Sequence, residues 1–277
     1  MYFWTLEQDA FLRDNYKKLQ AKEIALHVCR SESAVQGRAD ALGLKKGYKK
    51  YSHNETFFFV PDVLNSYWAG MIAADGCIRN NNLLLSLKFE DGHHVEKLAN
   101  DLSYTGIVKE RTSKGHKISI VEICGADKIV KDLDENFSVT TQKSLTLKPP
   151  NLQNLDHKLA FIKGYWDGDG CIRLEKERLE VSCCGTIEML TWIQELFDQL
   201  VPPHGKYHAL ARLRKSGPKS GKNHADYKIT GHRAESIFRR LHDLETPELD
   251  RKWSVMCNYK CRVYDKKCYG TWKSKFE

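Results

Sequence analysis

The feature that most constrains this chain is an internal repeat built around an Asp-Gly pair. The segment YWAGMIAADGCI at residues 67–78 returns as YWDGDGCI at residues 165–172, and alignment of the two Asp-Gly pairs gives an offset of 94 residues. Self-similarity at a fixed offset is the signature of a duplicated structural unit. The 277-residue chain is therefore expected to contain two copies of one fold.

The residues after each Asp-Gly pair repeat the same order of secondary structure. Their apolar spacing predicts two strands, a helix, a second hairpin and a last helix. These lie near 77–79, 83–89, 93–103, 107–111, 117–123 and 126–136 in the first copy, and near 171–175, 178–182, 186–200, 207–214, 226–230 and 233–243 in the second. The sequence thus predicts an α+β fold of two pseudo-symmetric αββαββα repeats, at residues 51–150 and 151–260.

Small residues recur on one face of each predicted motif helix. Gly70 and Ala74 are four residues apart, and Gly164 and Gly168 hold the same places in the second copy. Residues at this spacing share a helix face, whereas a glycine inside a helix costs about 1 kcal/mol relative to alanine. A close approach of two backbones gives a steric reason for that cost. We therefore expect the two motif helices to pack against each other.

Two aspartates, Asp75 and Asp169, end the motif helices, and each is followed by a glycine that stops the helix. The partial negative charge at a helix C-terminus disfavours a carboxylate. If the helices pack side by side, the two carboxylates also approach each other, and a divalent cation would relieve both penalties. Such a cation can orient a phosphate, activate water and stabilise a departing oxygen. The alternative, two unrelated Asp-Gly turns, explains neither the flanking repeat nor the small residues.

The segment before the repeats has the pattern of three short helices. Apolar residues at helical spacing follow cap residues at Thr5 and Ser31. Three tightly joined helices within residues 1–50 predict a helix-turn-helix module, whose third helix would enter the major groove of DNA. A small protein-binding bundle is the alternative. We place the domain boundary near residue 52.

Basic residues are clustered along a chain whose net charge is +8. The densest clusters lie at residues 1–50, 206–228 and 251–277, and the last of these includes a basic C-terminal tail at 261–277. Such clustering predicts a polyanionic partner, while ordinary solubility charge is the alternative explanation.

The composition is that of a folded intracellular protein. No run approaches the roughly 18 apolar residues that a membrane helix needs, and the N-terminal residues show no export signal. The nine cysteines lack the CxxC pairs of zinc ribbons, so we interpret them as free thiols, with zinc at Cys257, Cys261 and Cys268 as a minor alternative. We expect a cytoplasmic, nucleoid-associated protein without a membrane partner.

The two motifs resemble those of single-chain LAGLIDADG homing endonucleases. They read WAGMIAADG at residues 68–76 and IKGYWDGDG at residues 162–170, and the resemblance covers about residues 60–260. The family implies a pseudo-two-fold saddle that binds DNA, in which strands read the major groove and the motif helices form the subdomain interface.

The resemblance also assigns roles to particular residues. The catalytic, metal-binding acid of the family is the last acidic residue of each motif, which matches Asp75 and Asp169. The earlier acidic position is Ala73 in the first copy and Asp167 in the second. This departure falls on a position that is not the metal ligand, so we do not interpret it as a loss of activity.

Further residues follow from the same resemblance. The family places a basic residue near the scissile phosphates late in each copy, and TQKSLTL and LDRKWSV offer Lys143 and Lys252. Asp91 and Thr186 are candidates for the polar residue that positions water after the second strand. The resemblance implies Mg²⁺ as the cofactor, with Mn²⁺ as a substitute.

The expected partner is double-stranded DNA, bound by a monomer that needs no obligate protein partner. Candidate DNA contacts lie on the third N-terminal helix, the linker after it, the strands and the loop of the second copy: Gln36, Arg38, Lys45, Lys46, Arg79, Lys88, Arg111, Arg173, Arg212, Arg214 and Lys215.

The predicted function is that of a site-specific DNA endonuclease, a phosphodiester hydrolase of a mobile genetic element encoded by a bacterium or phage. Two alternatives share the fold: a cleavage-deficient DNA-binding regulator and an RNA-binding intron-splicing cofactor. The helix-turn-helix pattern favours DNA, because the major groove of A-form RNA is too narrow for a recognition helix.

Overall fold

The computed structural model describes residues 3–44, 51–113, 115–203, 208–216 and 222–258 of the chain. The chain divides into two compact units, Met1–Ser52 and His53–Glu277. The division falls beside residue 52, where the sequence pattern placed a domain boundary. No helix in the described ranges is long and apolar enough to cross a membrane.

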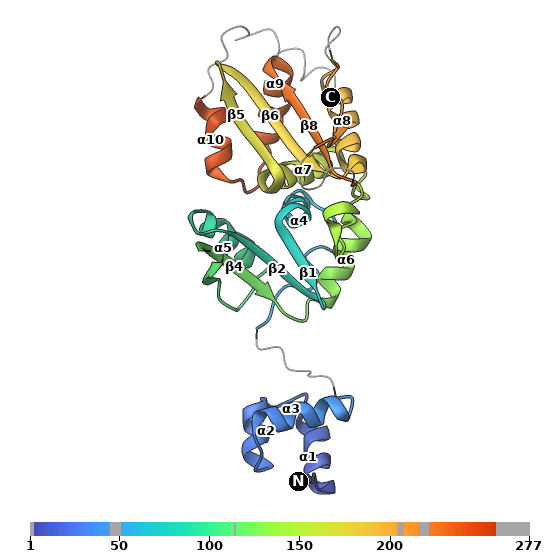
Figure 1. Ribbon diagram of the computed structural model, residues 1–277, viewed down its shortest axis with the longest axis vertical. Helices are drawn as coiled ribbons and strands as arrows, with labels where there is room; N and C mark the ends of the chain where they lie inside the picture. Colours follow the sequence, from blue (N-terminus) through green and yellow to red (C-terminus); the bar gives the residue numbers. More distant parts are fainter. Residues whose placement is uncertain (1–2, 45–50, 114, 204–207, 217–221, 259–277) are drawn as a thin grey trace. The chain divides into compact units, whose positions relative to one another are not determined.

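The first unit consists of three helices, α1 (Leu6–Asn15), α2 (Ala21–His27) and α3 (Glu32–Ala41) (Figure 1). Thr5 Oγ1 accepts a hydrogen bond from the Gln8 amide at 3.2 Å, and Ser31 Oγ accepts one from the Ala34 amide at 3.2 Å. These bonds pair amides that a helix N-terminus otherwise leaves unsatisfied. The three helices enclose a small core that includes Leu12, Tyr16, Ile24, Val28 and Val35.

The second unit contains both repeats, and each has the predicted order αββαββα. The first repeat consists of α4 (Val63–Asp75), β1 (Gly76–Arg79), β2 (Asn82–Lys88), α5 (Gly92–Asp101), β3 (Lys109–Ser113), β4 (His116–Ile123) and α6 (Asp127–Phe137). The second consists of α7 (Leu155–Asp169), β5 (Gly170–Glu175), β6 (Arg178–Gly185), α8 (Ile187–Leu200), β7 (Arg212–Leu213), β8 (Ala225–Thr230) and α9 (Gly231–His242). Short 3₁₀ helices, η1 (Phe89–Asp91) and η2 (Lys143–Leu145), and a last helix, α10 (Asp250–Asn258), complete the described part.

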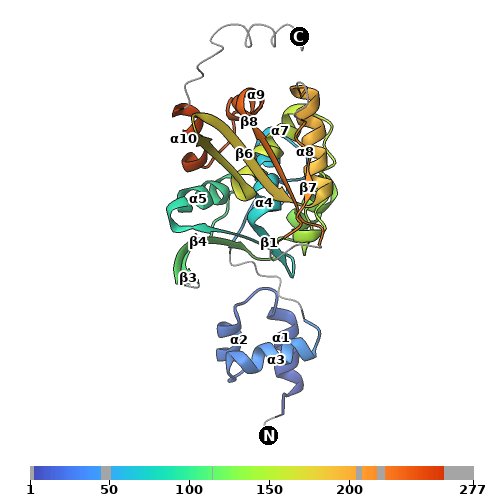
Figure 2. The same cartoon turned by 45° about the horizontal axis from the view of Figure 1, so that its top comes forward.

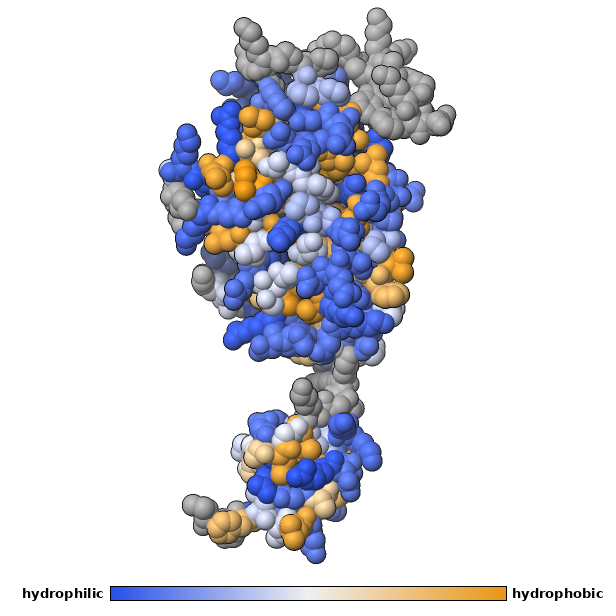
Figure 3. Space-filling view, turned by 90° about the vertical axis from the view of Figure 1, so that its right-hand side faces the viewer, coloured by the Kyte–Doolittle hydropathy of each residue, from blue (hydrophilic) through white to orange (hydrophobic). Residues whose placement is uncertain are grey.

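Each repeat builds one four-stranded antiparallel sheet, in the order β1-β2-β4-β3 and β5-β6-β8-β7. Figure 2 shows β3 and β7 at the edges of their sheets. Burial alternates along β2 and β8, because successive side chains of a strand point to opposite faces. One face of each sheet therefore packs on the helices, while the other carries exposed side chains. Figure 3 shows one side of the molecule, where hydrophobic residues are scattered among hydrophilic ones.

One helix and one strand differ from the prediction. α10 was not predicted from the sequence. Between Asp250 and Met256, its buried apolar residues are Trp253 and Met256, too few to display a helical period. The strand predicted at 207–214 is restricted among the described residues to Arg212 and Leu213, which alone pair with β8. The predicted basic tail at 261–277 lies outside the described residues.

The motif helices α4 and α7 lie side by side between the two sheets (Figure 1). A Cβ atom built on Gly70 would lie 1.9 Å from Phe161 O, and one built on Gly164 would lie 1.9 Å from Tyr67 O. The two contacts are related by the 94-residue offset, so the helices touch backbone to backbone about a pseudo-two-fold axis. The predicted helix contact is confirmed, and with it the fold that the resemblance to LAGLIDADG proteins implied.

Substitution of Gly164 by alanine is expected to destabilise the second unit. The added Cβ would fall inside the Tyr67 carbonyl, and separating the helices would open the core, at a cost of about 3 kcal/mol. The measurement is chemical denaturation followed by tryptophan fluorescence. Gly37→Ala in α3 is the matched control, because no atom lies within 4 Å of its added Cβ, and alanine there should raise the stability of the first unit by up to about 1 kcal/mol. Unchanged stability of Gly164→Ala would contradict the backbone contact.

Candidate active site

Asp75 and Asp169 are the last residues of α4 and α7, and the helix contact brings these two ends together. A Cβ atom built on Gly168, the residue before Asp169, would lie 2.2 Å from the Ala74 Cβ and 3.3 Å from Asp75 Oδ2. Both aspartate side chains are exposed to solvent. The structure therefore places the two predicted metal-binding carboxylates beside each other at an accessible surface.

Lys252 lies against the C-terminal end of α7. Its ammonium group donates to Trp166 O at 3.0 Å, Asp167 O at 2.5 Å, Gly168 O at 3.0 Å and Gly170 O at 2.7 Å. These carbonyls end the helix and carry its partial negative charge. Lys252 thus neutralises the helix end on which Asp169 stands.

Lys143 holds the corresponding place at α4, where its ammonium group donates to Ala74 O at 3.2 Å. The sequence alone predicts that only a bound cation relieves the unfavourable helix ends. The structure corrects this, because each helix end already has a lysine, and a metal ion would add to that positive charge.

Charges around the two carboxylates act on one another. Burial of its surroundings raises the pKa of the Asp75 carboxyl, while Lys252 and Lys143 lower it. Burial lowers the pKa of Lys143, and the negative charges of Asp169 and Asp75 raise it. The four groups therefore form one electrostatic cluster, in which each carboxylate favours the charged form of a lysine.

The donor set fits a hard divalent cation such as Mg²⁺. In the described ranges no group of three or more His, Cys, Asp or Glu side chains could hold a metal ion, and the Ala74 and Gly168 carbonyls are engaged by lysines. Two carboxylates remain. Mg²⁺ characteristically takes one or two protein carboxylates and completes its shell with water and phosphate oxygens, so this set suits a cation that binds together with a nucleic acid.

A pocket of about 100 Å³ opens beside Asp169. Its polar lining includes Lys143, Asp169, Tyr165, Cys184, Thr186 and His224. Tyr165, Cys184 and His224 were not predicted as site residues, because they come from α7, β6 and the segment before β8. The pocket gives Lys143 and Asp169 a shared, solvent-connected space.

Asp167, the other motif acid of the second copy, is buried and lies at the centre of a hydrogen-bond network. Its carboxylate accepts from Tyr67 Oη at 2.6 Å, Trp253 Nε1 at 2.6 Å and the Leu249 amide at 3.1 Å. Burial raises the pKa of Asp167 to about 6, although the three donors lower it. Asp167 therefore ties α4 and α10 to α7 and does not face the candidate metal site.

The network continues to His94, whose Nε2 lies 2.8 Å from Tyr67 Oη. Because the tyrosine proton is directed to Asp167, His94 donates its Nε2 proton to the tyrosine oxygen. Burial lowers the pKa of His94 to about 3, so the ring stays neutral. The 94-residue offset relates Asp167 to Ala73 and Tyr67 to Phe161, two apolar residues. The hydrogen bond between Tyr67 and Asp167 therefore has no counterpart at the symmetry-related positions.

Asp91 and Thr186, the candidates for positioning water, have structural roles. The Asp91 carboxylate is 4% exposed and pairs with Arg251 Nε at 2.8 Å. The Thr186 hydroxyl donates to Leu147 O at 2.6 Å and accepts from the Met189 amide at 3.3 Å. Each of these contacts joins one repeat to the other repeat's C-terminal segment. Their polar atoms are engaged within the protein, while Thr186 also lines the pocket beside Asp169. A role of either residue in positioning water stays a prediction.

The predicted DNA contacts lie in several places. Arg79, Lys88 and Arg111 share the exposed face of the first sheet by strand register, and Arg173 and Arg212 share that of the second. Arg214 and Lys215 follow β7, and Lys45 and Lys46 lie outside the described residues. Lys109 and Lys228 were not predicted as DNA contacts, yet they lie on the same two faces.

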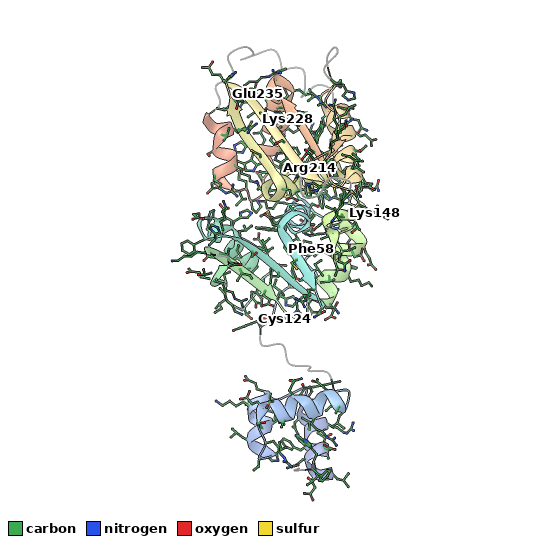
Figure 4. The ribbon with its side chains drawn as sticks, viewed as in Figure 1. Phe58, Cys124, Lys148, Arg214, Lys228 and Glu235 are labelled. Carbon is green, nitrogen blue, oxygen red and sulfur yellow. The ribbon has the colours of Figure 1, made fainter. Side chains whose placement is uncertain are left out.

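Several of these basic groups are held by acids. Arg173 Nε donates to Glu180 Oε1 at 2.8 Å, and Lys228 pairs with the other oxygen of that carboxylate. Arg214 Nε donates to Asp226 Oδ2 at 2.8 Å, and Figure 4 shows Arg214 and Lys228 on the second sheet. These pairs fix the direction of the basic side chains across the sheet face.

In the first unit, the two side chains predicted to contact the DNA groove, Arg38 and Gln36, differ in how accessible they are. Arg38 Nε donates to Asp9 Oδ1 at 2.8 Å, which joins α3 to α1. Gln36 is exposed and donates to Asp40 Oδ1 at 3.2 Å on its own helix. Gln36 is therefore the better placed of the two for an external contact.

Comparison with known proteins gives one partial sequence match. No protein-family model matches the chain. A stretch of 122 residues, 42% of this chain, is 31% identical to the probable translation initiation factor IF-2 of Methanocaldococcus jannaschii and covers 10% of that protein. The chain thus spans about a tenth of the length of this curated relative.

The similar solved structures are mostly LAGLIDADG homing endonucleases. The I-LtrWI enzyme bound to target DNA is 11% identical, with 74% of this chain and 88% of that chain covered and a TM-score of 0.44. I-SmaMI bound to uncleaved DNA with calcium ions is 12% identical, with coverages of 70% and 89% and a TM-score of 0.41. The N-terminal LAGLIDADG domain of DUF199/WhiA is 13% identical, with coverages of 69% and 90% and a TM-score of 0.43. Similarity at this level concerns the course of the chain and transfers no residue role.

The raised pKa of Asp167 predicts a particular pH dependence of stability. The unfolded carboxyl ionises near its ordinary value of 3.8 and the folded one near 6, so its favourable contribution is complete below pH 4 and is lost as the pH rises to about 6. The loss is on the order of 3 kcal/mol. Asp167→Asn removes this titration. Denaturant unfolding of both proteins from pH 4 to pH 7 should therefore show the wild-type free energy falling by that amount relative to the variant, and parallel curves would contradict the buried carboxyl.

Proposed function

We propose that the two repeats form a site-specific DNA endonuclease, which hydrolyses phosphodiester bonds of both strands with divalent metal ions held by Asp75 and Asp169. The observation that supports this most directly is the junction of α4 and α7. Two accessible carboxylates stand there at the ends of helices in backbone contact, each with a lysine at the same helix end. The two carboxylates at adjoining helix C-termini are unfavourable by themselves. Together with the lysines, they are suited to binding a cation and a phosphate.

The bound metal would supply a Lewis acid for the phosphate and lower the pKa of a bound water. The chain's own residues would bind the DNA and position the reacting groups. The basic side chains on the exposed sheet faces would bind the DNA backbone and read base edges in the major groove. Asp75 and Asp169 would hold the metal ions between the two sheets, where the reacting phosphates would bind. Because both aspartates belong to one chain, a monomer would cut both strands.

The first unit is proposed to add a second DNA contact. Its α2 and α3 are joined by a short turn, and α3 has the exposed Gln36 side chain near its middle. A recognition helix of this kind enters the major groove. In this proposal the module raises affinity and the length of DNA recognised, while cleavage belongs to the repeats.

The test is cleavage of a plasmid that carries the gene's own insertion locus with the insert removed, with and without Mg²⁺. Wild type should give discrete metal-dependent cuts, and Asp75→Asn or Asp169→Asn should slow cutting at least about 100-fold. DNA binding measured in Ca²⁺ should be retained. Asp156→Asn, an exposed aspartate in the first turn of α7, is the matched control and should cut normally.

The other outcomes separate the alternatives. Tight binding to that locus without cutting in Mg²⁺ or Mn²⁺ would replace the enzyme with a DNA-binding regulator of the same fold. Binding to a structured intron RNA in preference to the duplex would favour a splicing cofactor. Cutting that survives both aspartate substitutions would move the metal site elsewhere.

A further inference from the structure

An acid lies near the centre of the exposed face of the second sheet. Glu180 on β6 is only 7% exposed, because two basic side chains flank its carboxylate on that face. Arg173 Nε donates to Glu180 Oε1 at 2.8 Å, and Lys228 pairs with Oε2. Hydrogen bonds from Lys228 and Arg173 hold the pKa of the Glu180 carboxyl below its ordinary value, so it stays charged.

A second acid holds a second arginine on this sheet. Arg214 Nε donates to Asp226 Oδ2 at 2.8 Å, and Arg214 Nη2 donates to Asp226 Oδ1 at 2.5 Å (Figure 4). A two-point contact between a guanidinium and a carboxylate fixes the plane of the guanidinium. The second sheet therefore presents two arginines whose directions are set by the protein itself.

The first sheet has no acid at the positions that strand register makes equivalent. Arg79 pairs with Asn82 across β1 and β2, as Arg173 pairs with Glu180 across β5 and β6. Ile120 on β4 holds the register position of the other acid. In the described part of the chain, no acid forms an ion pair with Arg79. The two equivalent arginines thus differ in support.

The contacts of Arg173 leave one edge of its guanidinium available. A guanidinium has five N–H donors in a planar fork, and Glu180 accepts from Nε and from one proton of Nη2. The protons of Nη1 and the second proton of Nη2 remain, and the Arg173 side chain is 55% exposed. Two donors on one edge match the O6 and N7 acceptors of guanine in the major groove.

We infer that Arg173 reads one guanine in the half of the target that the second repeat covers, and that Glu180 is the residue that positions it. Arg214, held by Asp226, is a second reader of the same kind. Arg79 lacks such support and contributes charge to phosphate binding. A carboxylate facing DNA repels the backbone phosphates, so its place on this face is explained by base reading. The inference rests on the proposed DNA binding by the two sheets.

The test is selection of bound duplexes from a pool of randomised DNA, in Ca²⁺. Wild type should recover a site with fixed G·C pairs. Arg173→Ala and Glu180→Gln should relax the same G·C pair, with discrimination against the other bases falling roughly 10- to 100-fold. Arg79→Ala should instead weaken all sequences alike and reduce the salt dependence of binding by about one phosphate contact.

Glu175→Gln is the matched control for Glu180→Gln. Glu175 is an exposed acid two residues after Arg173 on β5, so it lies on the same face. Each variant removes one negative charge from this face, and each should bind unrelated DNA slightly more tightly. Only Glu180→Gln should lose discrimination. A purely structural Glu180 would instead show a lower melting temperature and weaker binding to selected and unrelated DNA together, which would contradict the inference.

The remaining outcomes separate this inference from the nuclease proposal. If wild type cuts its target but Glu180→Gln relaxes no base pair, or Arg79→Ala relaxes one equally, the inference is wrong and the nuclease proposal stands. If the predicted base pair is relaxed but wild type never cuts in Mg²⁺, base reading stands without cleavage. Absence of binding to any duplex would overturn both.

Discussion

The contact between α4 and α7 is the constraint on which the rest of the structure depends. Gly70 and Gly164 each face a main-chain carbonyl of the other helix, so no side chain separates the two backbones. This contact sets the axis that relates the repeats, and it places the two helix C-termini next to each other. The sheets lie on either side of the helix pair, which leaves their exposed faces with the basic residues that the nuclease proposal assigns to DNA.

The same contact creates an electrostatic problem at the helix ends. The partial negative charges of two helix C-termini lie next to the carboxylates of Asp75 and Asp169. This arrangement is unfavourable unless positive charge is supplied. Lys143 and Lys252 supply part of it from segments distant in sequence. What remains is a pair of accessible carboxylates at one place, which the nuclease proposal assigns to a divalent cation.

Sequence reasoning reached the fold because it relied on a duplication and on short-range spacing. Small residues four apart mark the packing face of each motif helix, and the Asp-Gly pair marks its end. The motif helices could therefore be predicted, and the repeated pattern after them predicted the order of strands. The roles of Asp91 and Thr186 could not, because their partners Arg251 and Leu147 belong to the other repeat. The inequality of the lysines was also hidden, since matching sequence contexts say nothing of how many carbonyls surround each ammonium.

The polar bridge from Tyr67 to Asp167 also determines which copies can pair. In a hypothetical dimer of two first repeats, each Tyr67 hydroxyl would meet Ala73 and lose its buried acceptor. In a dimer of two second repeats, each Asp167 carboxylate would meet Phe161 and lose one of its donors. The loss of a hydrogen bond costs about 1 kcal/mol, and each symmetric pairing would lose two. The two repeats are therefore complementary rather than interchangeable. Each repeat pairs more favourably with the other repeat than with a second copy of itself.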